Sequence, residues 1–414
     1  MKRNPLLPIF LIVVVDILGL TIMLPLLPFY AEHFGASAFT VGLLVSSYAA
    51  CSLVAGPLLG RISDSVGRKP VLLVSQAGTF IGFIILALAN SLWVVFLGRI
   101  IDGLTAGNLS LAQAYIADVT EPKDRAKSFA IIGIAFGIGF LFGPALSGVL
   151  AHYSLHYPIF VAAGLSLTSI VCTATLLPAS PPRPAVQPGA VEPEAAADPA
   201  GRRLRLLDWG TYLQYFRRPV LAGLLWEFFC FCFAFSTFTA GFALFAERRY
   251  SWHGLPFGPK QVGFVFAYSG LLGIILQGGL IGRLVKRYGE VKLITAGFVA
   301  AAIGYTVLGF STTVAILLIA ASFSSFGNGV LRPALTSLIT QNVSRNEQGV
   351  VLGLTQSLLS VAQIIAPTIA GMLIDRGHLT AWALWAAVIS AVALLLNRRA
   401  RAARLVAHGP VAQA

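Results

Sequence analysis

Twelve long apolar segments constrain this chain more than any other feature of its sequence. A helix rises about 1.5 Å per residue, so each segment is about long enough to cross the hydrocarbon core of a bilayer, which is roughly 30 Å thick. The chain is 57% hydrophobic and 11% charged, whereas soluble domains have about 25% charged residues. The sequence therefore predicts an all-α polytopic membrane protein with twelve transmembrane helices. The segments span approximately residues 6–28, 40–59, 70–90, 92–117, 127–151, 157–178, 219–246, 260–283, 291–310, 313–340, 348–374 and 379–397.

The basic residues indicate the orientation of these helices. Most Lys and Arg residues lie at the termini or in connections of one parity, and cytoplasmic connections are enriched in these residues. We therefore expect a protein of the inner (cytoplasmic) membrane with both termini in the cytoplasm. The net charge of +13 reflects this topology, so we expect no nucleic-acid partner. The exceptions lie within helices (Arg99, Arg332) or in the other connections (Arg248, Arg249, Lys260, Arg376).

A proline-rich stretch divides the chain into two similar halves. Residues 178–200 hold seven prolines, which is typical of an extended linker, and the basic stretch 202–209 is typical of an interfacial segment. We expect a six-helix bundle over 1–178, a cytoplasmic linker and interfacial segment over 179–218, and a second bundle with a basic cytoplasmic tail over 219–414.

Short motifs recur in the two halves at nearly constant offsets. Gly60-Arg61 and Gly67 recur 222 residues later as Gly282-Arg283 and Gly289, and Gly107-Asn108 recurs 220 residues later. Repeats of this kind indicate two pseudo-symmetric bundles with the substrate site between them, near the bilayer midplane.

Several motifs resemble those of the major facilitator superfamily. Gly60-x-x-x-Asp64-x-x-Gly67-Arg68-Lys69 resembles the signature loop between its second and third helices. Residues 97–103, Leu-Gly-Arg-Ile-Ile-Asp-Gly, resemble its fourth-helix signature, whose arginine is implicated in proton transfer. Residues 114–125 resemble the turn that follows in tetracycline-efflux-type antiporters. The resemblance implies the major facilitator fold and membership of the twelve-helix drug:proton antiporter family.

The resemblance also assigns roles to the loop and to the fifth segment. It implies a cytoplasmic gate formed by Gly60, Asp64, Gly67, Arg68, Asp118 and Arg125, although an ordinary basic loop is the simpler interpretation. In the fifth segment, Gly139, Gly143, Pro144 and Gly148 look like the antiporter motif of exporters. Small residues allow helices to approach closely, so a helix-packing seam is the alternative interpretation.

Ionisable side chains inside transmembrane segments are costly and therefore candidates for function. A carboxyl in low-dielectric surroundings binds its proton more tightly, and a nearby arginine has the opposite effect. We expect Asp16 to be the principal protonation site, Arg99 its modulator and Asp102 a partner or second site; Glu227 is a further candidate. The alternatives are a carboxyl hydrogen-bonded to backbone or arginine for Asp16, a self-neutralising pair for Arg99 and Asp102, and an interfacial position for Glu227.

The seventh segment carries phenylalanines at helical spacing on one face, from Phe228 to Phe245. This face predicts either aromatic packing or an apolar wall of the substrate cavity, which would suit lipophilic compounds. The cavity candidates are Phe231, Phe235, Phe238, Asn108, Gln113, Gln277, Asn328 and Gln356.

Together these features predict proton-coupled efflux of lipophilic drugs or related small molecules by alternating access. A lipid or glycolipid flippase of the same fold and a non-transporting membrane sensor are the alternatives. Tetracycline itself is not the expected substrate, because tetracycline exporters carry a His in helix 8 and acids in helices 9 and 3. Segments 261–283, 291–310 and 70–90 lack these residues. We expect a monomer with a small lipophilic substrate, protons and membrane lipids as partners, and no enzyme activity, metal or cofactor besides the proton gradient.

Overall fold

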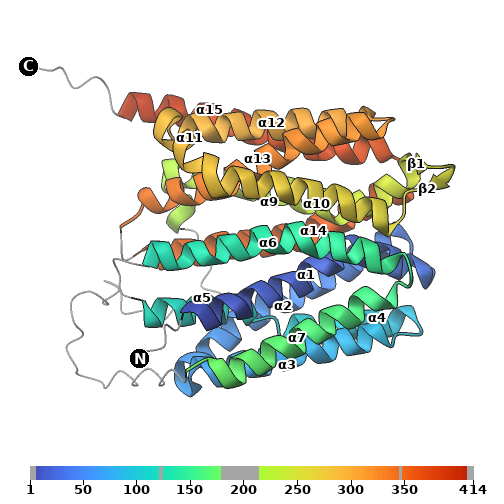
Figure 1. Cartoon of the computed structure of the whole chain (residues 1–414). Coiled ribbons are helices and arrows are strands. Elements are labelled where there is room, and N and C mark those ends of the chain that lie inside the picture. Colours follow the sequence, from blue (N-terminus) through green and yellow to red (C-terminus); the bar gives the residue numbers. More distant parts are fainter. Residues whose placement is uncertain (1–5, 121–124, 179–213, 345–346, 408–414) are drawn as a thin grey trace, which may run out of the picture. The chain divides into compact units, whose positions relative to one another are not determined.

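The computed structural model describes residues 6–120, 125–178, 214–344 and 347–407, and nearly all of them are helical (Figure 1). One hairpin, β1 (Ser251–Trp252) and β2 (Leu255–Pro256), and one π-helical segment, η1 (Leu276–Leu280), interrupt the α-helices. The helices are α1 (Leu6–His33), α2 (Ala38–Val66), α3 (Arg68–Ala87), α4 (Leu92–Leu104), α5 (Asn108–Val119), α6 (Arg125–Ala151), α7 (His156–Leu176), α9 (Pro219–Arg249), α10 (Pro259–Ile275), α11 (Ile281–Tyr288), α12 (Glu290–Phe310), α13 (Val314–Gln341), α14 (Gln348–Asp375) and α15 (Leu379–Ala407).

The prediction of twelve membrane-spanning helices is confirmed. Within the described ranges, twelve helical stretches are long and apolar enough to cross a bilayer. Two of them combine consecutive elements: Leu92–Ile116 covers α4 and most of α5, and Pro259–Tyr288 covers α10, η1 and α11. The chain is therefore a multi-pass, all-α membrane protein.

The fourth predicted segment is not one continuous helix. It breaks between α4 and α5, where Gly107 N donates a hydrogen bond to Ser75 Oγ of α3 at 3.0 Å. Ser75 Oγ in turn donates to the Thr105 carbonyl. A side chain of α3 thus satisfies backbone groups that the broken helix exposes. The break places Asp102 on α4 and Asn108 at the start of α5.

The basic stretch 60–69 is mostly helical, so the loop expected between the segments 40–59 and 70–90 was predicted too long. α2 continues to Val66, and α3 begins at Arg68. Gly67 alone makes the turn with φ of 104°, a conformation that a side chain disfavours. The polar side chains of this stretch are therefore carried on the last turns of a helix.

By packing, the described residues form two compact units. Unit 1 holds everything up to residue 178 together with 239–274 and 363–379; unit 2 holds 214–238, 275–344, 347–362 and 380–407. α9 and α14 contribute to both units. The division into bundles at the linker stays a prediction.

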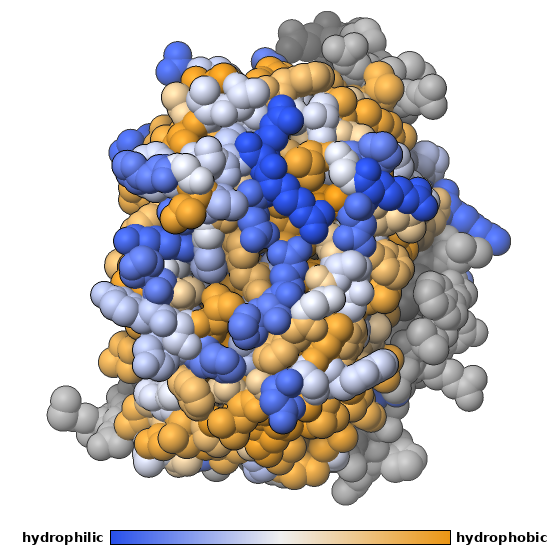
Figure 2. All heavy atoms as spheres, turned by 90° about the vertical axis from the view of Figure 1, so that its right-hand side faces the viewer, coloured by the Kyte–Doolittle hydropathy of each residue, from blue (hydrophilic) through white to orange (hydrophobic). Residues whose placement is uncertain are grey.

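Each unit has its own apolar core. In unit 1, α1, α3, α5 and α6 enclose a cluster that includes Ile12, Leu72, Ile116 and Ala135. In unit 2, Leu276, Leu293 and Val330 form the centre of a smaller cluster. At the helix ends near β1 and β2, hydrophilic side chains gather on the surface and hydrophobic ones surround them (Figure 2). This distribution agrees with helices whose ends are in water and whose sides face lipid.

Candidate functional site

Asp16 is half-buried in unit 1 among polar side chains of three helices. It lies in the middle of α1, and its carboxyl is hydrogen-bonded to Ser169 of α7 and Gln76 of α3. Gln76 Nε2 also donates to Ser169 Oγ at 2.7 Å. Oδ1 of Asp16 is buried and has no hydrogen-bond partner among the described residues. The alternative interpretation, a carboxyl held by backbone or by an arginine, does not match these partners.

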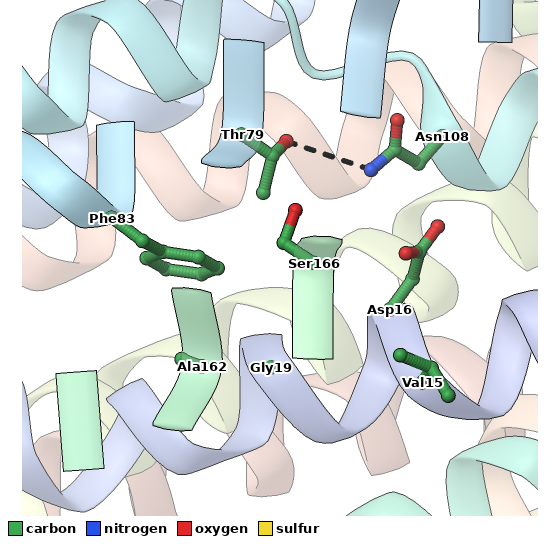
Figure 3. Close-up of a pocket in the computed structure, with 8 residues that line it drawn as sticks. All are labelled: Val15, Asp16, Gly19, Thr79, Phe83, Asn108, Ala162 and Ser166. Carbon is green, nitrogen blue, oxygen red and sulfur yellow. Dashed lines mark hydrogen bonds between the residues drawn. The ribbon is translucent and has the colours of Figure 1, made fainter. Parts of the chain in front are cut away.

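A small cavity of about 20 Å³ adjoins Asp16 (Figure 3). Asp16 and Ser166 point toward Thr79 and Asn108 across it, and Phe83 closes one end. Asn108 Nδ2 donates to Thr79 Oγ1 at 3.5 Å, whereas Asn108 Oδ1 is buried without a partner. The remaining lining residues are Val15, Gly19 and Ala162.

Arg99 and Asp102 form a buried ion pair on α4, as the spacing predicts. Arg99 Nη1 is 2.9 Å from Asp102 Oδ2, and the two residues are only 5% and 4% exposed. The guanidinium also lies over the ring of Tyr48, with 4.2 Å from its carbon to the ring centroid. The Asp102 carboxyl accepts a further hydrogen bond from Thr79 of α3. The pair is thus held by α2, α3 and α4 together.

Arg68 gathers the residues of the expected cytoplasmic gate. Although it is only 6% exposed, its Nε is 2.9 Å from Asp118 Oδ2 and its Nη2 is 2.5 Å from Asp64 Oδ1. Its Nη1 donates to Ser63 Oγ at 2.5 Å and, more weakly, to the Gly60 carbonyl at 3.4 Å. The structure thus brings four of the six proposed gate residues together beside the turn at Gly67. Arg125 begins α6, but its side chain lies outside the described part.

The glycines of the expected antiporter motif make close helix contacts in unit 1. A Cβ on Gly139 or Gly143 would overlap Ile17 or Thr21 of α1, and Thr21 Oγ1 donates to the Gly139 carbonyl at 2.8 Å. A Cβ on Gly148 would lie 3.0 Å from the Lys260 carbonyl of α10. α6 therefore packs closely against α1 on one side and α10 on another, and its contact with α1 includes Ile17, the next residue after Asp16.

The phenylalanine face of α9 is largely buried. Phe238 lies 5.6 Å from Tyr305 in unit 2, and Phe242 lies 5.3 Å from Phe266 in unit 1, both between ring centroids. These contacts agree with the packing interpretation for this face. Phe231 and Phe235 stack on each other at 6.1 Å, and Phe235 is half-buried. A role for these rings in the substrate cavity stays a prediction.

The remaining candidates are distributed over both units. In unit 2, Glu227 is 1% exposed, which differs from the interfacial position considered for it. Asn328 bonds to Tyr305, with 3.2 Å from Nδ2 to the phenol oxygen. Gln113, Gln356 and Gln277 are exposed, and Gln277 lies in η1. π-Helical segments are frequent at functional sites.

Sequence reasoning missed a charged cluster at the helix ends of unit 1. Arg248 of α9 donates to Glu32 Oε1 at 3.1 Å and to the Ile374 carbonyl at 2.9 Å. Glu32 is also hydrogen-bonded to Glu247. Asp375 caps α2 by accepting from the amide nitrogens of Ala38 and Phe39 at 2.8 and 3.0 Å. The signal for this cluster was Arg248, a basic residue in the connections that otherwise have few.

In unit 2, Arg218 and Glu347 form a pair near the starts of α9 and α14. Arg218 Nη2 is 2.6 Å from Glu347 Oε1, and this bond lowers the pKa of Glu347 from 4.5 to about 2. The side chains are 50% and 26% exposed, so the pair contributes at most about 1 kcal/mol.

This pair predicts a pH-dependent difference in stability between the protein and Glu347→Gln. Because the folded state lowers the pKa of Glu347, its contribution is complete above about pH 4.5 and disappears as the pH falls toward 2. Thermal unfolding of the purified proteins at several pH values measures the difference. Glu192→Gln, in the expected linker, controls for loss of one acid. A difference that is constant over this range would contradict the prediction.

The comparisons with known proteins agree on one superfamily. A family model described as Major Facilitator Superfamily matches residues 9–281 and 257–411. The chain is 31% identical to the class C tetracycline resistance protein of Escherichia coli over 376 residues, which are 89% of each protein. It is 26% identical to multidrug resistance protein 2 of Bacillus subtilis (strain 168), over 87% of this chain and 86% of that protein.

The solved structures show the same fold. The crystal structure of the human organic anion transporter MFSD10 (TETRAN) matches with a TM-score of 0.71 and 24% identity. The match covers 95% of this chain and 99% of the other.

Proposed function

The chain belongs to the major facilitator superfamily, within its twelve-helix drug:proton antiporter family, and from this premise we propose that it exports lipophilic drugs or related small molecules in exchange for protons. The relatives named as tetracycline and multidrug resistance proteins support drug efflux. The finer claims, proton coupling and antiport, are our inference from the site in unit 1.

The observation that carries the proposal is the surroundings of Asp16. Ionised carboxylates are costly to bury without charged partners, and among the described residues the partners of this carboxyl are the neutral side chains of Ser169 and Gln76. A bound proton removes that cost, so protonation and the burial of Asp16 are linked. If the substrate favours the state in which Asp16 releases its proton, proton and substrate compete by linkage. That competition is the thermodynamic requirement for antiport.

Arg99 and Asp102 are proposed as the second part of the coupling site. Asp102 lies against α3: a Cβ on Gly82 would lie 2.9 Å from the Asp102 Cβ. Tetracycline exporters carry an acid in their third helix. In this chain α3 has no acid, and Asp102 of the neighbouring α4 places a carboxyl beside α3 instead. Since the acids and His that tetracycline exporters carry elsewhere are absent, we propose drugs other than tetracycline as substrates.

The proposal includes the setting in which the protein works. The distribution of Lys and Arg supports an inner-membrane location with both termini in the cytoplasm. We propose that the cluster around Arg68 closes the cytoplasmic side in one state of an alternating-access cycle. A monomer that uses the proton gradient without a cofactor is sufficient for this cycle.

The test uses the purified full-length protein in liposomes with an imposed proton gradient. We expect lipophilic cations from a test panel to move against the proton flow, and a pH-sensitive dye to report protons moving the opposite way. Fluorescent lipids are assayed in parallel to test the flippase alternative. A drug transport rate that is the same with and without the proton gradient would contradict the proposal. Lipid transport without drug transport would also contradict it.

A further inference from the structure

We propose that Thr79 and one water molecule pass a proton between Asp16 and Asp102, so that the two carboxyls form one pathway. This inference rests on the proposed proton coupling and names the residue that connects its two acids. The two carboxyls belong to different helices, α1 and α4, and Thr79 of α3 contacts both sites. It lines the cavity beside Asp16 (Figure 3). It is also hydrogen-bonded to Asp102.

The cavity beside Asp16 has the size and the lining of a site for one water. Its volume is about 20 Å³, and a buried water needs roughly 10–15 Å³ and two to four polar partners. Asp16 Oδ1 and Asn108 Oδ1 are buried acceptors without partners. The hydroxyls of Thr79 and Ser166 are further polar groups on the wall. A water there can donate to the orphaned oxygens, which otherwise remain unsatisfied at a cost of about 1–3 kcal/mol each.

The hydrogen bonds of Thr79 orient its hydroxyl group as a proton relay requires. Asn108 Nδ2 donates to Thr79 Oγ1 at 3.5 Å, so the threonine oxygen faces the amide and the cavity as an acceptor. The Thr79 hydroxyl is also bonded to the Asp102 carboxyl, and an ionised carboxylate is only an acceptor. The hydroxyl proton therefore points to Asp102. Asn108 is a positioning residue in this arrangement, because its amide orients Thr79 and transfers no proton itself.

The transfer balances without any additional reactant. The O–H bond of protonated Asp16 breaks as its proton passes to the water, and the water releases one of its own protons to Thr79 Oγ1. The original hydroxyl proton of Thr79 moves to the Asp102 carboxylate. The net result is one proton lost by Asp16 and gained by Asp102. Arg99, 2.9 Å from Asp102 Oδ2, stabilises the carboxylate before the proton arrives and favours its release afterwards.

The pathway also explains the arrangement around the ion pair. The groups that face Asp102 are the Arg99 guanidinium, the Tyr48 phenol and the Thr79 hydroxyl. Neither Arg99 nor Tyr48 lines the cavity beside Asp16. The Tyr48 ring instead lies against the guanidinium, with 4.2 Å between the guanidinium carbon and the ring centroid. Thr79 is thus the group in this set that connects Asp102 with the Asp16 cavity.

The experiment compares Thr79→Val, which removes the hydroxyl at nearly constant volume, with Thr79→Ser, which retains it. Thr168→Val is the matched control, because Thr168 is exposed on α7 and its hydroxyl donates to the Gly164 carbonyl of its own helix. Two assays are made in liposomes: transport driven by a proton gradient, and exchange of labelled for unlabelled substrate without a gradient. Exchange requires substrate binding and the movement between states, but no net proton transfer.

We expect Thr79→Val to slow gradient-driven transport roughly 100-fold and to leave exchange near the wild-type rate. Thr79→Ser and Thr168→Val are expected to behave like wild type in both assays. The relay is overturned if Thr79→Val retains gradient-driven transport, if it loses exchange to the same degree, or if Thr79→Ser is as slow as Thr79→Val. Wild-type protein without any gradient-driven transport would instead reject the proposed function, so the two failures are distinguishable.

Discussion

Replacing Asp16 with asparagine is expected to abolish transport driven by a proton gradient. Asparagine has nearly the shape of aspartate and can keep hydrogen bonds to Ser169 and Gln76, but its amide does not exchange a proton in this pH range. The expected rate under a gradient is that of liposomes without protein. Exchange of substrate without a gradient should continue, because the variant resembles the protonated form of the site.

The measurement compares the purified variant with wild type in the same liposome assay. Asp198→Asn, in the expected linker, is the matched control for loss of one aspartate. Substrate-induced proton release from the protein in detergent gives a second readout, and we expect the Asp16→Asn variant to release fewer protons. Gradient-driven transport at the wild-type rate would remove Asp16 as the principal site and leave Asp102 and Glu227 as the candidates.

Replacing Arg99 with methionine is expected to destabilise the protein by about 3–5 kcal/mol. The change leaves the Asp102 carboxylate buried with Thr79 but without its cation, and it removes the contact with the Tyr48 ring. A second change, Asp102→Asn, removes the orphaned charge. The double variant is therefore expected to recover most of the lost stability, apart from the part due to Tyr48, which is about 0.5–2 kcal/mol.

Unfolding of the single and double variants in the same detergent measures this coupling. A single variant as stable as wild type would show that the pair contributes little. A double variant no more stable than the single one would show that packing of the arginine stem, rather than its charge, is what the protein needs. The same double variant is expected to lack gradient-driven transport even where its stability is restored, because the relay then has no acceptor.

The fold could be predicted because a bilayer leaves few choices. Helix lengths follow from membrane thickness, and the repeated glycine motifs gave the family resemblance that the comparisons confirmed. The pair of Arg99 and Asp102 was also predictable, since residues three apart on a helix are neighbours. In the basic stretch 60–69, the residue types gave the family resemblance. The extension of the helix to Val66 could not be predicted, because loops and helix ends contain the same polar residues.

The sequence by itself determined the class of protein, the number of spanning helices and which ionisable groups lie within the long apolar segments. Only the tertiary structure decided which of these groups meet. Asp16 could be identified as an acid in an apolar segment, but its partners come from α3 and α7, 60 and 153 residues away. Thr79 was not a candidate, because a threonine in a helix is ordinary until packing places it between two carboxyls. Local spacing fixes contacts within a helix, whereas contacts between helices depend on how whole surfaces pack, and no short pattern encodes that.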